Sequence, residues 1–379
     1  MSSAISGQSS RRRYIDWARA LAILLMIEAH TVDVWTWASA RKTASFRDAV
    51  VVGGFAATLF LWLAGVSLVL AAASVARKQG GRAAAVDAVC RRGLEIFLLA
   101  FLFRLQALIV TPGSHPLALF RVDILNIMGP AIVVAALVWG LARTTAGLVT
   151  AYAAITVAFA MLTPIVRASA LVDRLPIWFQ WYVRPAGDLT IFTAFPWVGF
   201  LFAGAAVGAL IAAVRDPAAE GRLQLWLAAA GAALVAAGLY AATRPSIYSR
   251  SFFWTSSPTW FSIRVGILMI TLAALYALAQ LAERRGIELR RIERFGRSSL
   301  FIYWIHVELV YGYASWLLRG RLPLWGTLVA CVPFSMLMYG AVVQRDRLVE
   351  LWRLRRGVRN TPLPAAAETQ YGGVREASL

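Results

Sequence analysis

Long runs of apolar residues alternate with short polar segments along most of the chain. A stretch of about 20 apolar residues is long enough to cross a bilayer as an α-helix, and by this criterion the chain holds about ten spans. The predicted spans are 15–36, 50–75, 93–110, 122–142, 145–166, 191–214, 223–242, 259–282, 298–318 and 323–343. The pattern therefore predicts an all-α fold, a polytopic transmembrane bundle of about ten helices.

The composition agrees with this interpretation. Of the 379 residues, 60% are hydrophobic and 15% are charged, whereas soluble domains are about half apolar and a quarter charged. The mean hydropathy is +0.66. The two cysteines, Cys90 and Cys331, show no CxxC spacing, so neither a zinc site nor a disulfide framework is expected. No metal is predicted.

The net charge of +19 has to be placed along the chain before it can be interpreted. If the amino terminus is cytoplasmic, 24 of the 38 lysines and arginines fall in cytoplasmic segments. The positive-inside rule then predicts that both termini are cytoplasmic. The basic excess is thus a topology signal, and no nucleic-acid partner is expected.

Three parts follow along the chain: a cytoplasmic basic N-terminus (1–13), a transmembrane domain (14–345) and a cytoplasmic tail (346–379) that is largely disordered after 360. The first helix is expected to be retained, because no cleavage site follows a short apolar core. An aromatic loop, 172–188, lies on the predicted outer face, either as part of an interfacial aromatic belt or as a cover over a site.

Ionisable side chains inside the predicted spans are the main functional signal, because each is costly in a bilayer. Arg19 and His30 are 11 residues apart on the first helix, which is about 16 Å along the axis and close to three full turns. They share a face, with Arg19 near the cytoplasmic boundary. Eight polar residues from five predicted helices share the outer depth band: His30, Asp33, Arg104, Asp123, Asn126, Arg264, His306 and Glu308.

Two interpretations of these residues remain open. They form one site, or they form unrelated pairs that hold the bundle together. A histidine inside a membrane is rare and suited to proton transfer, which favours a function for His30. His115 lies in a proline-flanked loop, where plain solvent exposure is expected.

Several stretches resemble one family. RYIDWARALAILLMIEAH (13–30) looks like the first helix of the transmembrane acyltransferase superfamily, in particular of heparan-α-glucosaminide N-acetyltransferase-like membrane proteins. FLWLAGVSLVLAAA (60–73), FRVDILNIMGPAIV (120–133), FTAFPWVGFLFAGAAVG (192–208) and RIERFGRSSLFIYWIHV (291–307) resemble further family segments. The resemblance covers most of residues 11–345 in order.

The departures from the family pattern decide which histidine we assign as the catalytic residue. Ala20 replaces the usual glycine after the arginine, and 35–48 lacks the loop histidine that the human-type enzymes place there. Related bacterial O-acyltransferases carry a basic residue and a histidine with ten residues between them, as Arg19 and His30 do. The catalytic assignment follows that second pattern.

The resemblance implies acyl transfer from cytoplasmic acyl-CoA, with acetyl-CoA as the expected donor, to a hydroxyl or amine on the outer face. Acyl transfer needs a base and oxyanion donors. We assign His30 as the base and expect Asp33, one turn further on, to orient it, since Glu28 points elsewhere on the helix. His306 is a second acid or base.

The remaining site residues are assigned to substrate binding. Arg104, Arg264 and Asn126 would stabilise the oxyanion or bind acceptor oxygens, and Asp123 and Glu308 belong to the same group. At the cytoplasmic end, Arg19, with Asp16 beside it, is expected to bind the donor. Coenzyme A phosphates would also meet Arg91, Arg92, Arg294 and Arg297, since guanidinium forks suit phosphate oxygens.

The expected partners are acyl-CoA, membrane lipids and a glycan or lipid-linked acceptor, with a homo-oligomer possible. The expected location is a bacterial inner membrane. Two other functions remain open: a transporter or flippase for an anionic or lipid-linked solute, and a non-catalytic membrane interaction protein. No internal repeat and no paired broken helices support the transporter.

Overall fold

The computed structural model describes residues 12–78, 80–110 and 115–355, and no strand occurs in these ranges. The predicted all-α, polytopic fold is confirmed. The α-helices are α1 (Arg13–Trp35), α2 (Ala44–Gly53), α3 (Phe55–Lys78), α4 (Arg82–Val110), α5 (Ile124–Leu141), α6 (Thr145–Arg167), α7 (Ala170–Asp173), α8 (Ile177–Val183), α9 (Ala194–Ala213), α10 (Pro217–Ala242), α11 (Phe253–Ser256), α12 (Pro258–Arg284), α13 (Arg290–Arg297), α14 (Ser299–Tyr311) and α15 (Leu324–Arg355). Short 3-10 helices are η1 (Ala40–Lys42), η2 (Pro116–Phe120), η3 (Gly187–Leu189) and η4 (Tyr313–Ser315).

Eight helical segments of the described chain are long and apolar enough to cross a membrane, with α2 and α3 counted together. The other two predicted spans correspond to α1 and α14. α1 is 23 residues long but carries five charged side chains, and α14 has only 13 residues. α14 ends at Tyr311 because Gly312 adopts an extended backbone, whereas the sequence predicted a span to 318.

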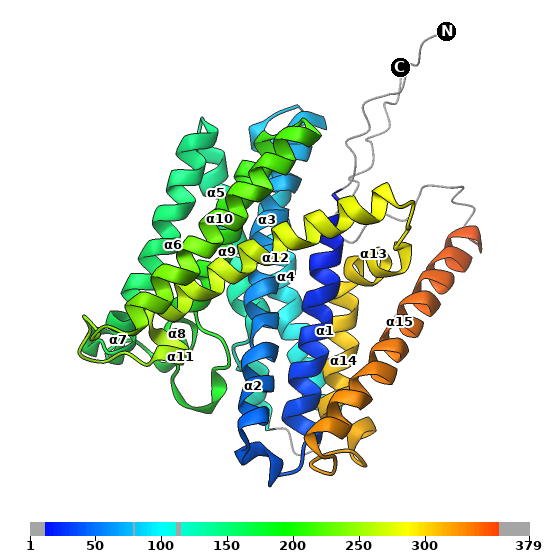
Figure 1. Ribbon diagram of the computed structural model, residues 1–379. Helices are drawn as coiled ribbons and strands as arrows, with labels where there is room; N and C mark the ends of the chain where they lie inside the picture. Colours follow the sequence, from blue (N-terminus) through cyan, green and yellow to red (C-terminus); the bar gives the residue numbers. More distant parts are fainter. Residues whose placement is uncertain (1–11, 79, 111–114, 356–379) are drawn as a thin grey trace, which may run out of the picture.

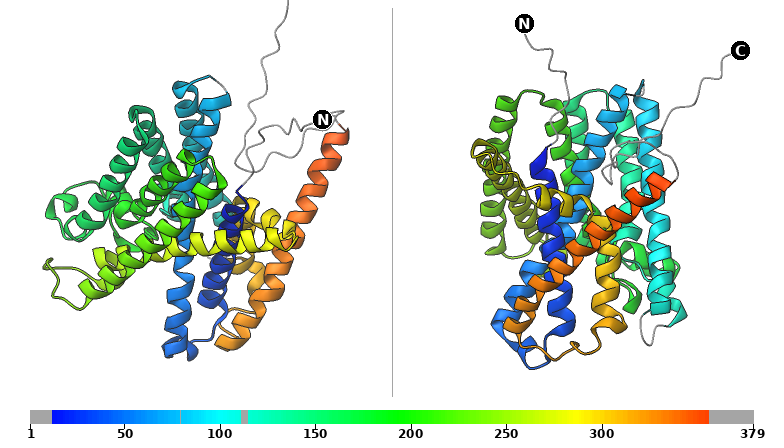
Figure 2. Two further views of the ribbon diagram at one scale, coloured as in Figure 1. Left: turned by 45° about the horizontal axis from the view of Figure 1, so that its top comes forward. Right: turned by 90° about the vertical axis from the view of Figure 1, so that its right-hand side faces the viewer.

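The helices run between two ends of the bundle. α1 begins and α15 ends at the same end, at the top of Figure 1, which we call the terminal end. α2 begins at the opposite, far end, where α14 also leads into α15. Figure 2 shows α15 crossing the outside of the bundle obliquely. α15 continues ten residues past the predicted boundary at 345; the N-terminal residues 1–11 and the predicted disordered segment after 360 lie outside the described residues.

Close backbone contacts between helices hold the bundle together. A Cβ on Gly204 of α9 would lie 1.9 Å from the carbonyl oxygen of Trp62 in α3, and one on Gly65 would lie 1.9 Å from the carbonyl of Leu201. No side chain fits at either position. Small residues at such crossings are expected in a membrane, where helices associate through close packing because lipid tails are as apolar as leucine.

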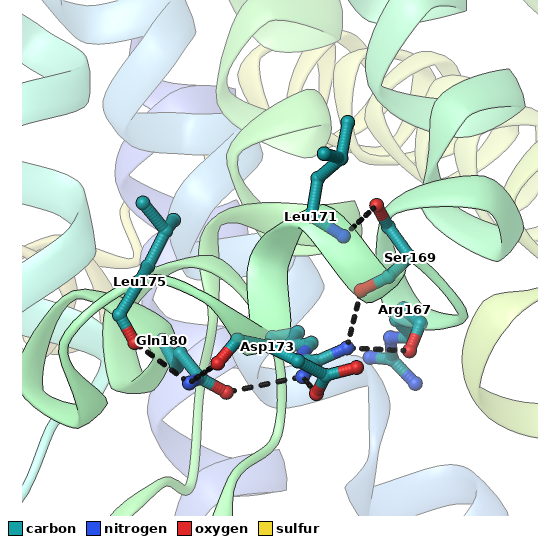
Figure 3. Close-up of polar contacts among 7 residues, drawn as sticks. Arg167, Ser169, Leu171, Asp173, Leu175 and Gln180 are labelled. Carbon is teal, nitrogen blue, oxygen red and sulfur yellow. Dashed lines mark hydrogen bonds and ion pairs between the residues drawn. The ribbon is translucent and has the colours of Figure 1, made fainter.

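The aromatic segment between α6 and α9 folds around one arginine. Arg184 donates to the carbonyl oxygens of Arg167 (3.3 Å) and Ser169 (3.1 Å), and it pairs with Asp173. Gln180 donates to the carbonyl of Asp173 at 3.3 Å, and Figure 3 shows this network. The predicted loop 172–188 therefore contains two short helices, α7 and α8, that are cross-linked by hydrogen bonds.

The same segment is attached to the start of α5. The Val122 N–H donates to the Leu189 carbonyl (2.9 Å), and the Ile191 N–H donates to the Val122 carbonyl (3.0 Å). Tyr182 of α8 also hydrogen-bonds Asn126. Burial raises the pKa of the Tyr182 hydroxyl, so it stays protonated there. The aromatic segment thus covers the end of α5 that carries Asp123 and Asn126.

Candidate active site

Two histidines from distant parts of the chain form the centre of the candidate site. Nδ1 of His30 in α1 lies 2.9 Å from Nε2 of His306 in α14, and the rings are nearly parallel, 11° apart with centroids separated by 5.0 Å. Nδ1 of His306 donates to the Ile302 carbonyl at 2.8 Å. His306 is fully buried, whereas His30 is partly exposed. Sequence reasoning placed them at one depth, and the structure places them in contact.

The contact follows from how α13 and α14 pack against α1. At the terminal end, Gly296 lies so close to α1 that a Cβ there would be 1.9 Å from the Asp16 carbonyl. From this contact α1 and α14 both run toward the far end (Figure 1). His30 is 14 residues beyond Asp16, and His306 is ten beyond Gly296. The 2.9 Å contact between the two rings shows that both imidazoles reach the same level of the bundle.

Asp33 has a different partner from the one the sequence predicted. The Tyr311 hydroxyl donates to Oδ2 of Asp33 at 3.0 Å, and the edge of the Tyr311 ring meets the His30 ring with centroids 5.4 Å apart. His30 is hydrogen-bonded to His306, and Asp33 acts on His30 through its charge. The reason is that Asp33 lies one turn further out and is exposed, within reach of the last residue of α14.

Tyr311 was missed by sequence reasoning. It is five residues after His306, so helix periodicity does not place the two side chains on one face. The signal that was available is weak: a tyrosine directly before the glycine that ends an apolar helix. Its contact with both Asp33 and His30 depends on tertiary packing.

A second group of polar residues lies at the start of α5. Arg104 of α4 pairs with Asp123 at 2.8 Å, and the Asp123 side chain has only 3% exposure. Asp123 caps α5 by accepting from the N–H groups of Leu125 (3.0 Å) and Asn126 (3.4 Å), while Oδ1 of Asn126 accepts from the Asp123 N–H (3.0 Å). This capping box explains both residues structurally. Arg104 is held by its ion pair with Asp123, and of its nitrogens Nε has no hydrogen-bond partner among the described residues.

Several buried polar atoms of this region have no hydrogen-bond partner in the described part of the chain. They are both carboxylate oxygens of Glu308, Nε of Arg104 and Nε of Arg121. Glu308 is only 8% exposed, and the charge of Arg104 acts on it. Buried polar groups in native proteins almost always have partners. An unsatisfied group of this kind fits a place where a polar ligand binds.

Arg264 and Glu28 lie on another side of α1, at the junction of α2 and α3. Arg264 donates to the Gly54 carbonyl at 2.5 Å, and its guanidinium stacks on the rings of Phe55 and Trp260. Oε2 of Glu28 is buried beside Gly53. The structure therefore does not bring Arg264 to the histidine pair, and Glu28 points away from His30, as its position on the helix predicted.

The terminal end holds the residues that we assigned to the donor. Asp16 and Arg19 pair at 2.9 Å, and Arg19 also donates to Oγ of Ser67 at 2.8 Å. Four of the arginines near this end have carboxylate partners: Arg91 with Asp87, Arg92 with Glu95, and Arg294 and Arg345 with Asp346. Arg297 is half-buried, and no described residue pairs with it. Within the described ranges, it is thus the arginine of this group without an ion-pair partner.

His115 caps the start of η2. His115 is exposed and accepts from the Leu117 N–H at 3.2 Å at the start of η2. Within the described ranges, no group of three or more His, Cys, Asp or Glu side chains is arranged to hold a metal ion. The candidate site is therefore built from the histidine pair and its charged neighbours.

The fold and this site together define a polytopic membrane protein with a hydrogen-bonded histidine pair inside the bundle. A family model described as heparan-alpha-glucosaminide N-acetyltransferase, catalytic, matches residues 11–235, more than half of the chain, and the chain belongs to this family. The matched region contains His30, Arg104 and Asp123, while α14 with His306 lies beyond it. No curated protein matches the chain in sequence comparison.

Proposed function

We propose that the protein transfers an acyl group, most simply acetyl, from cytoplasmic acyl-CoA to a hydroxyl or amine of a glycan or lipid-linked acceptor on the outer face of the membrane. The family supports a membrane acetyltransferase in general. The observation that carries the finer proposal is the His30–His306 pair, with an accessible His30 at the same level as the unsatisfied groups of Glu308 and Arg104.

In the proposed reaction His30 is the general base. It takes the proton of the acceptor hydroxyl or amine as that oxygen or nitrogen attacks the thioester carbonyl. The new C–O or C–N bond forms, the C–S bond breaks, and the proton on His30 passes to the leaving thiolate. Arg104 is the best candidate for stabilising the oxyanion, because its Nε lacks a partner among the described residues.

The donor would approach from the terminal end. Arg297 offers a guanidinium for a phosphate oxygen, and the charge bias along the sequence supports a cytoplasmic position for this end. The Arg19-to-His30 distance along α1 is about 16 Å by helix rise. A long flexible pantetheine arm suits that separation, since the phosphates would stay at the boundary while the thioester reaches His30.

The acceptor would approach from the far end. Asp33 is exposed there, Tyr311 links it to the histidine pair, and Glu308 lies deeper with both oxygens unsatisfied. Carboxylates suit the hydroxyl and amino groups of sugars as hydrogen-bond acceptors. The proposed setting is a bacterial inner membrane, with membrane lipids around the apolar helices.

The test is release of free coenzyme A thiol from acetyl-CoA by the purified protein in detergent, with amino-sugar and sugar-alcohol acceptors. His30→Ala and the more conservative His30→Gln should lower turnover by about 10²–10⁴-fold, the usual contribution of a general base. His115→Gln, in an exposed loop, is the matched control and should keep full turnover. Thermal unfolding and acetyl-CoA binding of each variant show whether it is folded.

A transporter is the alternative that this experiment separates. If the native protein neither binds nor consumes acetyl-CoA, and instead moves an anionic or lipid-linked solute into vesicles without coenzyme A, the enzyme proposal is wrong. Turnover that is equal in native protein and His30→Gln would contradict the assigned base while leaving the enzyme class intact.

A further inference from the structure

We infer that His306 is a positioning residue: it holds His30 as the tautomer protonated on Nδ1, so that Nε2 of His30 is the nitrogen that takes the acceptor's proton. This rests on the proposed function for the identity of the reaction. It replaces the role of second acid or base that the sequence suggested for His306.

The first step of the argument concerns His306 alone. Its Nδ1 lies 2.8 Å from the Ile302 carbonyl oxygen, and a carbonyl oxygen only accepts hydrogen bonds. Nδ1 of His306 therefore carries a hydrogen. In a neutral imidazole the other nitrogen then has a lone pair, so Nε2 of His306 is an acceptor.

The second step transfers this constraint to His30. Nδ1 of His30 and Nε2 of His306 are 2.9 Å apart, a distance that requires one hydrogen between them. Because Nε2 of His306 is the acceptor, Nδ1 of His30 is the donor. Neutral His30 then keeps its lone pair on Nε2, as a general base requires.

The opposite arrangement is excluded on electrostatic grounds. If Nε2 of His306 donated, His306 would carry hydrogens on both nitrogens and be a cation. Its relative exposure is 0%, and its polar contacts among the described residues are with the backbone of Ile302 and Tyr303 and with another imidazole. The nearest acids hold other positions: Asp33 bonds Tyr311, and Glu308 interacts with Arg104. A buried, unpaired cation is strongly disfavoured.

Accessibility separates the two histidines in the same way. Both nitrogens of His306 are engaged, and the side chain is inaccessible, so no nitrogen remains to meet a substrate. His30 is partly exposed, and its Nε2 has no partner among the residues that the structure describes. The hydrogen bonds run from the Ile302 carbonyl through buried His306 to accessible His30. In the same way, an orienting group fixes the tautomer of the catalytic histidine in other enzymes.

A direct test measures the tautomers without any substrate. The chain has only three histidines, so ¹⁵N-histidine labelling of the full-length protein in detergent gives three imidazoles, and His115→Gln removes the one outside the site. We expect His30 and His306 both to show a protonated Nδ1 and an unprotonated Nε2, the minor form of free imidazole. A His30 protonated on Nε2 would overturn the inference, whether or not the protein proves to be an acyltransferase.

A kinetic test compares two substitutions, His306→Gln and His306→Asn, whose side-chain amides extend to different distances. The carboxamide oxygen of His306→Gln falls near the place of Nε2 and can still accept from His30. His306→Asn keeps the contact with Ile302 but does not reach His30. We expect His306→Gln to keep turnover within about tenfold of native, and His306→Asn to lose about 10²–10⁴-fold with unchanged thermal stability. Equal loss in His306→Gln and His306→Ala, with both folded, would mean that His306 itself transfers a proton.

Discussion

The two ends of the bundle use the same kinds of charged residue in opposite ways. At the terminal end, Asp16 is 2% exposed and is paired with Arg19, which is also bonded to Ser67. Toward the far end, Glu308 is comparably buried, yet neither of its oxygens has a partner among the described residues. The first arrangement is complete within the chain, whereas in the proposed function the second would be completed by the acceptor.

The backbone packing shows the same contrast. α13 touches α1 at Gly296 with no room for a side chain, which fixes α1 and α14 relative to one another. Further along, α14 ends early at Gly312, and Tyr311 is the α14 side chain that bonds Asp33 in the described part of the chain. A rigid terminal end therefore sets the geometry of the histidine pair, while polar side chains near the far end stay available. Precise sites generally depend on such a supporting frame.

The largest expected effect is on stability at the terminal end. Asp16→Ala removes the partner of Arg19 and should lower the free energy of unfolding by about 3–5 kcal/mol, the usual cost of breaking a buried ion pair. Thermal unfolding of the purified protein measures this. Asp87→Ala breaks an exposed pair with Arg91 and is the control, which should leave the unfolding midpoint unchanged. Similar midpoints for the two variants would show that the Asp16 pair is not a structural element.

A smaller effect is expected where α13 meets α1. Gly296→Ala forces a methyl group against the Asp16 carbonyl and should cost about 1–3 kcal/mol of stability, because the two helices must separate. It should also reduce turnover, since the register of His306 against His30 changes. Gly340→Ala in α15, where a Cβ has no neighbour within 4 Å, is the matched control. An unaltered midpoint and turnover in Gly296→Ala would argue against this contact as the frame of the site.

The sequence predicted the fold well because membrane spans depend on a one-dimensional property. Apolar runs of sufficient length identified the helices, including α1 and α14, which are short or charged. Helix ends were less predictable. α14 stops at Gly312 through an extended backbone rather than a loss of apolar residues, and α15 continues to Arg355 although its last turns are polar.

The sequence predicted the depth of the two histidines in the bundle, but not which side chains contact one another. Helix rise placed His30 and His306 at one level, since each is a fixed number of residues from the same end. Which faces meet depends on the crossing at Gly296, and no property of the sequence alone specifies it. Asp33 was expected to orient His30, but its carboxylate accepts a hydrogen bond from Tyr311. Arg264 was expected at the same site, but it donates to the Gly54 carbonyl.

The smallest and most specific prediction concerns Glu308. Removing its charge should raise the free energy of unfolding, whereas Asp16→Ala should lower it. Glu308→Gln keeps the shape but removes a buried charge whose oxygens have no hydrogen-bond partner among the described residues, so the free energy of unfolding should rise by about 1 kcal/mol. Turnover at low acceptor concentration should fall about tenfold, because a hydrogen bond to a charged group contributes about 1.5–3 kcal/mol. Acetyl-CoA binding should be unchanged. If Glu308→Gln instead destabilises the protein as Asp16→Ala does, Glu308 is a structural charge, and both ends of the bundle use buried carboxylates for stability.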